Sequence, residues 1–230
     1  MKSTDLGVFL HRSVYSESSL IVWFFTRENG VQKFLFRGGK KKAHSLFPMA
    51  VCELSYYGHK HSDLFNLTAV ETAQPSTFQF NPISSTIAYF CVECAKKCMH
   101  QGDVDESVFQ FLVNFSNCLD REKNLGILPL QFLVEFSEVL GLKPHFEDEE
   151  GRFFNIDTGV FQSSTNSFER IATGPGIDLI KSLIHDGAVT SSTKKIREEA
   201  LNIMLEYYKI HIPRFDNLET FDVVKEILNA

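Results

Sequence analysis

The sequence lacks any long apolar run, since its longest uninterrupted stretches, such as Leu20–Phe25 and Ile127–Leu130, span only a few residues. A membrane-spanning helix needs about 20 such residues. The segment Met1–Asp5 is followed neither by an apolar stretch of signal-peptide length nor by a small-residue cleavage site. We therefore expect no membrane association and a cytoplasmic location.

The sequence is also poor in cysteine and tryptophan, with five copies of the first and one of the second. An odd number of cysteines spread over a chain of this length does not form a disulfide framework and fits a reducing compartment. Phenylalanine is instead abundant, at 22 copies. These rings supply area for a core and for stacking, and composition does not separate the two uses.

Motifs of common enzymes are missing. Arg37-Gly38-Gly39-Lys40 lacks the further glycines of a phosphate-binding loop and the hydroxyl that follows its lysine. The sequence contains neither a Gly-x-Ser-x-Gly elbow nor a His-Glu-x-x-His pair, and no pairing of carboxylates suggests acid–base catalysis. The sequence therefore predicts no catalytic residue, no cofactor and no enzymatic activity.

Charge is divided unevenly along the chain. The net charge is -6, but residues 1–74 carry nine basic and six acidic side chains and thus a charge of +3, which leaves -9 for the remainder. This asymmetry favours two parts with different partners, of which the basic part is suited to a polyanion.

The first part has the pattern of a small β-barrel. Short runs rich in β-branched and aromatic residues alternate with turn signals, of which Asn29-Gly30 is a strong hairpin signal. The predicted strands are Leu6–His11, Leu20–Thr26, Val31–Arg37, Val51–Tyr57 and Leu64–Val70. Five short strands in this length are typical of the oligonucleotide-binding (OB) barrel.

A polar stretch flanked by Pro75 and Pro82 predicts a linker at residues 75–82. Beyond it, apolar residues recur with the helical period of 3.6 residues in place of the strand period of 2. Predicted helices run from Ser84 or Ser85 to His100, from Asp105 to Leu119, from Pro129 to Gly141, and over Ile177–Ile184, Thr193–Ile210 and Leu218–Leu228. A small hairpin is expected at about 146–162. The predicted fold is α+β and multi-domain: an OB barrel over 1–74, then an all-helical domain over 83–230 with the hairpin inserted.

Cys91, Cys94 and Cys98, with His100 beside them, are the strongest candidates for metal ligands. A structural zinc site needs four ligands and normally takes a second close pair from another segment, and no such pair is present. The spacing also places the three thiols on one helix face, where a free cysteine behaves as a small hydrophobic residue. Core packing is the favoured interpretation.

His59 and His61 alternate in a turn, with His11 and His44 elsewhere in the same part of the chain. Asp63 is the only possible ligand at a matching spacing, so a solvated polar turn is favoured over a metal site. We predict that no metal is bound.

The remaining candidate site is the basic segment Arg37–Lys42, which follows a strand that carries cations and aromatic rings. Its cations could neutralise phosphates, two glycines would let the backbone approach a ligand, and the rings could stack on bases. A solvated lysine run is the alternative, and the barrel favours nucleic acid. The predicted DNA-binding residues are Lys33, Phe34, Phe36, Arg37, Lys40, Lys41 and Lys42.

Several segments resemble the bacterial recombination mediators of the RecO family. In the predicted barrel these are Gly7–Leu10, Tyr15–Leu20, Phe25–Gly30, Arg37–Lys40, Leu46–Pro48 and Glu53-Leu54, and in the helical part Pro129–Pro144, which ends Leu140-Gly141-Leu142-Lys143-Pro144. Taken together, in this order and with this spacing, the matching segments extend over nearly the whole chain. Many members carry a four-cysteine zinc knuckle in the helical domain, whereas residues 145–162 here contain no cysteine. The resemblance therefore implies a zinc-free member whose hairpin is held by Phe153, Phe154, Ile156 and Phe161.

The resemblance implies a DNA repair and recombination protein that cleaves no bond. Members bind single- and double-stranded DNA, anneal complementary strands, engage the acidic tail of single-stranded DNA-binding protein (SSB), and act with RecR to help RecA load. A nucleoid-associated location in the cytoplasm would follow. For the tail carboxylate we expect cations near helix ends in the acidic part: Arg121, Lys123, Lys194, Lys195 and Arg197.

Two other classes of function stay open. One is an adaptor built from the barrel and helices that binds only proteins. The other is a zinc protein or metal-dependent enzyme that uses the helix of Cys91, Cys94 and Cys98.

Overall fold

The structure is a computed structural model that describes residues 2–43, 46–58, 62–148, 150–187 and 192–227. The chain forms two compact units, Met1–Arg121 and Glu122–Ala230, here called the first and second units. Each is described by itself below.

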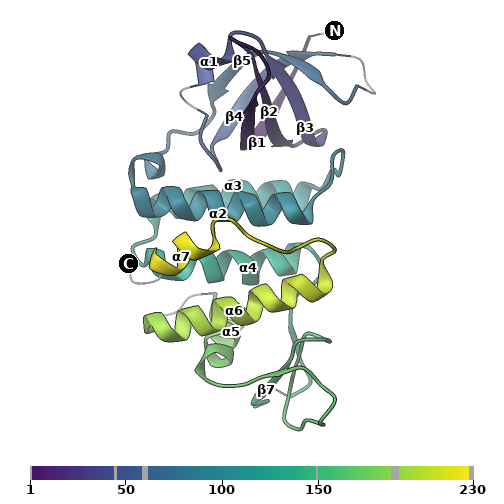
Figure 1. Cartoon of the computed structure of the whole chain (residues 1–230), viewed down its shortest axis with the longest axis vertical. Coiled ribbons are helices and arrows are strands. Elements are labelled where there is room, and N and C mark those ends of the chain that lie inside the picture. The colour runs from purple at the N-terminus through teal and green to yellow at the C-terminus, as the bar shows by residue number, and fades with distance from the viewer. Residues whose placement is uncertain (1, 44–45, 59–61, 149, 188–191, 228–230) are drawn as a thin grey trace. The chain divides into compact units, whose positions relative to one another are not determined.

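The first unit contains a closed barrel of five strands, β1 (Lys2–Val14), β2 (Leu20–Thr26), β3 (Gly30–Phe36), β4 (Val51–Tyr57) and β5 (Phe65–Thr72) (Figure 1). The strand order is β1-β2-β3-β5-β4, and β4 also pairs with β1. All pairs are antiparallel except β3 with β5. This partly parallel, five-stranded closure is the OB-type barrel that the sequence predicts, and the α+β class is confirmed.

The period-2 alternation of the strands fills the barrel with phenylalanine rings. On β2, Val22 and Phe24 point inward and are fully buried, whereas Ile21 and Trp23, which alternate with them, are only half-buried. Phe24 lies edge-to-face with Phe9 of β1 and with Phe34 of β3, at ring-centroid distances of 5.3 and 5.9 Å. Edge-to-face ring pairs stabilise a core beyond what the burial of their apolar surface contributes. Much of the phenylalanine content is therefore core.

A single turn of helix, α1 (Gly39–Lys42), follows β3. The sequence predicts a loop here, so this part of the prediction is wrong. Gly38 allows the change of direction because its φ is +68°, which L side chains adopt only with strain. At the carboxyl end of the turn, Arg12 Nη1 donates a hydrogen bond of 2.8 Å to the Ala43 carbonyl, which ties α1 to β1.

Two long helices complete the first unit, α2 (Pro82–Cys98) and α3 (Glu106–Arg121), which pack against each other and against β1 (Figure 1). The predicted cap of α3 is confirmed, because Asp105 Oδ1 accepts from the backbone nitrogens of Ser107 and Val108 at 2.8 and 3.1 Å. The predicted cap of α2 is wrong. Asn81 occupies that position in place of Ser84 or Ser85, and it allows Pro82 to take the first helical position.

The segment predicted as a linker is packed into the first unit. It contains a short 3-10 helix, η2 (Phe78–Phe80), whose Phe78 side chain is 1% exposed. The Thr77 nitrogen and hydroxyl both donate to Asp120 Oδ1 of α3 at 2.8 Å. The chain thus divides after α3, beyond the predicted boundary at 75–82, because α2 and α3 bury their apolar faces within the first unit.

Cys91 and Cys94 of α2 are fully buried, and this burial holds the pKa of both thiols well above the usual value. Cys98 is partly buried, and its pKa is raised to about 12 for the same reason. The interpretation of Cys91 and Cys94 as packed thiols is confirmed. Within the described ranges, no group of three or more His, Cys, Asp or Glu side chains is placed to hold a metal ion. His44, His59 and His61 lie outside those ranges.

The second unit is built on α4 (Leu128–Val139), preceded by η3 (Leu125–Ile127). Its other helices are α5 (Pro175–Asp186), α6 (Lys194–His211) and α7 (Phe221–Ile227). The α4, α5 and α6 helices contact one another, and the buried Tyr208 hydroxyl of α6 donates to the Leu133 carbonyl at 2.7 Å. Among the described helices of the chain, none is long and apolar enough to cross a membrane.

A sheet of four short strands is inserted into the second unit, in the order β6-β8-β7-β9. These are β6 (His145–Phe146), β7 (Phe153–Asn155), β8 (Val160–Gln162) and β9 (Ile171–Ala172). The predicted hairpin is the β7–β8 pair. Phe154 and Phe161 are fully buried with ring centroids 4.7 Å apart, and Phe154 meets Tyr207 of α6 at 5.7 Å. Aromatic packing therefore secures the hairpin, with Ile156 buried and Phe153 half-buried beside it.

We expect Gly30→Ala to destabilise the first unit by more than about 3 kcal/mol. Gly30 has a φ of +62°, and a Cβ atom there would lie 1.7 Å from the Asp103 carbonyl oxygen, in the connection between α2 and α3. Gly38→Ala is the matched control, because its φ is +68° but nothing lies within 4 Å of its Cβ; it should cost about 1–2 kcal/mol. Urea unfolding followed by fluorescence of Trp23, the only tryptophan, measures both variants. Equal losses would show that the close approach at Gly30 does not limit stability.

Candidate nucleic-acid interface

The basic segment predicted to bind DNA forms an exposed surface beside the barrel. Arg37 follows β3, and Lys40, Lys41 and Lys42 project from the single turn of α1, where all of these side chains are exposed. Arg12 of β1 is also exposed and reaches the same turn through its hydrogen bond to Ala43. We call these five cations the basic cap. Arg12 joins the basic cap only through this tertiary contact, so its position 25 residues before Arg37 in the sequence does not reveal it.

The loop between β1 and β2 lies against the basic cap. The Lys40 nitrogen donates to the Ser18 carbonyl of this loop at 3.3 Å, and the Tyr15 nitrogen donates to the Ser19 carbonyl at 3.1 Å. The loop exposes Tyr15, which is 59% accessible, next to Val14 at the end of β1. Cations beside an exposed ring suit the charged backbone and the flat bases of a single strand.

Phe34 and Phe36 cannot serve as base-stacking residues. They are 0% and 1% exposed, and they point into the barrel together with Phe9 and Phe24. Their prediction as DNA-binding residues is wrong, because a base could reach them only if the barrel opened. The prediction chose the wrong face of the strand. Side chains alternate along β3, so Phe34 and Phe36 point inward, whereas the half-buried Lys33 and Leu35 lie on the outer face.

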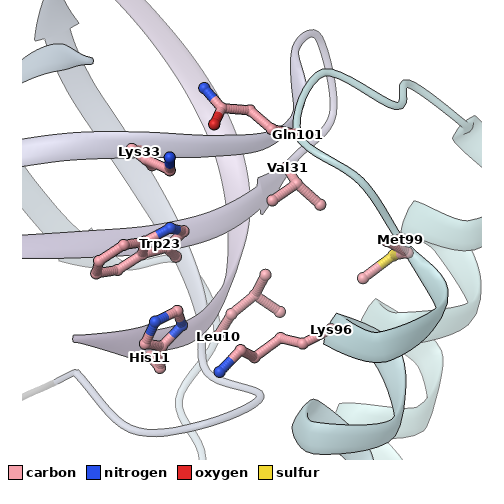
Figure 2. Close-up of a pocket in the computed structure, with 8 residues that line it drawn as sticks. All are labelled: Leu10, His11, Trp23, Val31, Lys33, Lys96, Met99 and Gln101. Carbon is pink, nitrogen blue, oxygen red and sulfur yellow. The ribbon is translucent and has the colours of Figure 1, made fainter. Parts of the chain in front are cut away.

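The outer face carries a different ring at the matching position. His11, Trp23 and Lys33 lie directly opposite one another on β1, β2 and β3, because His11 pairs with Trp23 and Trp23 with Lys33. His11 stacks on Trp23 with ring centroids 4.0 Å apart and planes 17° apart (Figure 2). We call these three residues the ring row. Trp23 and His11 were missed, although the alternation of Trp23 with buried Val22 and Phe24 signals an outward ring.

Burial lowers the pKa of His11 to about 4, and the nearby charge of Lys96 on α2 adds to this effect. The ring is therefore neutral at pH 7. Its Nδ1 atom is buried and has no hydrogen-bond partner among the described residues. Leaving a buried polar atom unpaired costs about 1–3 kcal/mol, which makes such an atom a candidate for contact with a ligand.

The cations predicted to bind an acidic protein tail are distributed over both units. Arg121 ends α3 in the first unit, whereas Lys123, Lys194 and Lys195 belong to the second. Lys194 is half-buried and the other three are exposed. Arg197 is wrong as a candidate, because it is only 7% exposed and its Nη1 atom donates to the Ser192 carbonyl. Its amphipathic position on α6 turns it inward, which a cation count cannot reveal.

Fold and surface together define the class: an OB-type barrel protein with a basic cap at its barrel and no sequence motif of catalysis. Residues 1–76 match the family model described as "Recombination protein O N terminal". Proteins named "DNA repair protein RecO" match along the chain, with 28% identity in Phocaeicola vulgatus and 26% in Bacteroides fragilis, each over 100% of both chains. The relative of that name in Flavobacterium psychrophilum is 27% identical over 94% of each chain. The chain is therefore similar to proteins of the RecO family along its whole length, and its first 76 residues match the amino-terminal model of that family.

We expect protonation of His11 to destabilise the first unit in acid. The folded-state pKa of about 4 lies below the ordinary 6.5, so the unfolded chain binds a proton first and stability falls as pH drops from about 6.5 towards 4. Between pH 7 and pH 5, His11→Gln should lose less stability than the wild type, by on the order of 1 kcal/mol after allowance for solvent screening of this half-buried ring. Urea unfolding followed by Trp23 fluorescence measures the difference, with the exposed His145→Gln as control. The same pH dependence in the wild type and in His11→Gln would contradict the low pKa.

Proposed function

We propose that this protein acts in DNA repair and recombination, and that its first unit binds single- and double-stranded DNA through the basic cap without reading sequence. The observation that supports this most is the cluster of exposed cations that α1 and Arg12 form beside an OB-type barrel. Contacts from lysine and arginine to phosphates position a protein on DNA but do not specify bases.

Strand annealing follows from the same surface. Two complementary strands repel each other through their phosphates, and a cationic surface that binds one strand lowers this repulsion for the second. No bond is broken, so we propose that the protein is not an enzyme and works by binding alone. In the cell it would lie at the nucleoid and, together with RecR, help RecA to load on DNA covered by SSB.

We expect the combined variant Lys40→Ala, Lys41→Ala and Lys42→Ala to bind a single-stranded oligonucleotide roughly tenfold more weakly at low salt. Each lost phosphate contact should also flatten the plot of log affinity against log salt by about 0.7, and thus by up to about 2 for the three. The side chains are exposed, so thermal stability should change little. Fluorescence anisotropy of a labelled oligonucleotide over a salt series measures both quantities.

The matched control removes the same charge from the second unit, by replacing the exposed Lys123, Lys195 and Lys209 with alanine. It should keep the affinity and the slope of the wild type. Equal effects of the two triple variants would mean that net charge, and not the basic cap, governs binding. Absence of DNA binding by the wild type would favour the adaptor that binds only proteins.

For the acidic tail of SSB we propose the second unit. The sequence beyond residue 74 is acidic overall, so it repels such a tail at a distance and contact must rely on local cations near apolar surface. Lys194 and Lys195 begin α6 and lie next to its cap residue, Thr193. A terminal carboxylate paired with either ammonium group would gain a charge-assisted hydrogen bond.

We expect Lys194→Ala combined with Lys195→Ala to weaken binding of a tail peptide by roughly five- to tenfold, because the double variant removes the one charge-assisted contact of the carboxylate, which contributes on the order of 1 kcal/mol. Isothermal titration of the full chain with the peptide measures this. Lys40→Ala combined with Lys41→Ala removes the same charge from the first unit and should leave the affinity unchanged. The reverse pattern would assign the tail to the basic cap.

A further inference from the structure

The first unit has a cavity of about 250 Å3 beside the ring row, which the basic cap does not include (Figure 2). Its apolar lining is Leu10, Val31 and Met99, and its polar lining is Lys33, Lys96 and Gln101, with His11 and Trp23 as an aromatic wall. The cavity is slightly smaller than the ~300–1,000 Å3 of pockets for drug-sized ligands. It is therefore suited to a single planar group.

The walls of the cavity are fixed by backbone contacts between the barrel and the end of α2. Val31 of β3 forms a parallel bridge with Gln101, and the Gly102 nitrogen donates to the Val31 carbonyl at 3.0 Å. The Gln101 side chain donates to the Asp63 carbonyl, in the loop between β4 and β5, at 3.1 Å. A cavity held in this way is formed before any ligand arrives.

We infer that this cavity takes one base of a bound single strand, with the phosphate of that nucleotide at the ammonium group of Lys96. The inference rests on the proposed binding of DNA by the same unit. The faces of a base would pack on the apolar lining, and a base edge would offer a partner to the buried Nδ1 atom of His11. In Figure 2, Lys33 and His11 lie on opposite sides of Trp23, and Lys96 extends towards the ring row from α2.

The position of the cavity favours a strand of DNA over a protein tail. Lys33 lies four residues before Arg37 on the same chain segment, so the cavity and the basic cap are roughly 13 Å apart along β3. A few nucleotides span this distance. A strand whose phosphates contact the basic cap could therefore place a neighbouring base in the cavity, and OB folds bind oligonucleotides on the face of their second and third strands.

Fluorescence of Trp23 and a pair of oligonucleotides test the inference on the full chain. The probes are oligothymidylate and an abasic oligonucleotide of equal length, which have the same charge but differ in their bases. Oligothymidylate should quench Trp23 and bind roughly tenfold more tightly than the abasic strand. Lys96→Ala should weaken oligothymidylate binding several-fold, whereas Lys97→Ala, one residue further along α2 and not part of the cavity lining, should not.

The outcomes separate this inference from the proposed function. Salt-dependent binding that is equal for both probes, with unchanged Trp23 emission, would overturn the cavity and leave DNA binding by the basic cap intact. Absence of binding to either probe would overturn both proposals. The assignment to a base within a strand would also fail if thymidine monophosphate bound as tightly as oligothymidylate, or if an acidic peptide ending in phenylalanine quenched Trp23 and oligothymidylate did not.

Discussion

Closure of the five-stranded barrel fixes which side chains of the first unit reach solvent. Because successive residues of a strand point to opposite sides, packing Phe24 and Phe34 inside the barrel forces Trp23 and Lys33 outward. A shift of one residue in register would exchange these sets and expose the phenylalanine core, which makes the register strongly specified. The ring row is thus a consequence of how the core is packed.

The fold of the first unit also brings distant parts of the sequence to one surface. Arg12 and Lys42 are separated by a hairpin, yet the Arg12 hydrogen bond to Ala43 places them at the same turn. The two proposed contacts with DNA then differ in kind. The basic cap supplies exposed charge, whose effect is screened by salt, whereas the cavity supplies apolar surface and an unpaired buried nitrogen, whose effects depend on the presence of a base.

The sequence predicts what depends on local chemistry and misses what depends on packing. The Asn29-Gly30 turn, the Asp105 cap and the five strands follow from residue preferences, and the structure contains them. To predict which rings face outward, the alternation of side chains along each strand must be applied residue by residue. The prediction that Phe34 and Phe36 bind DNA ignored this alternation, and both rings are buried. The division after Arg121 could not be predicted, because it depends on α2 and α3 burying their faces in the first unit.

The most direct test of the account is hydrogen–deuterium exchange of the full chain with and without a single-stranded oligonucleotide, read out by mass spectrometry. Binding through the basic cap and the ring row predicts slower exchange in peptides that contain residues 10–23 and 31–43, and near residue 101 at the end of α2. Exchange in the β4 strand should change little. Protection confined to residues 122–227, with none in the barrel, would show that DNA binds to the second unit and would contradict the account.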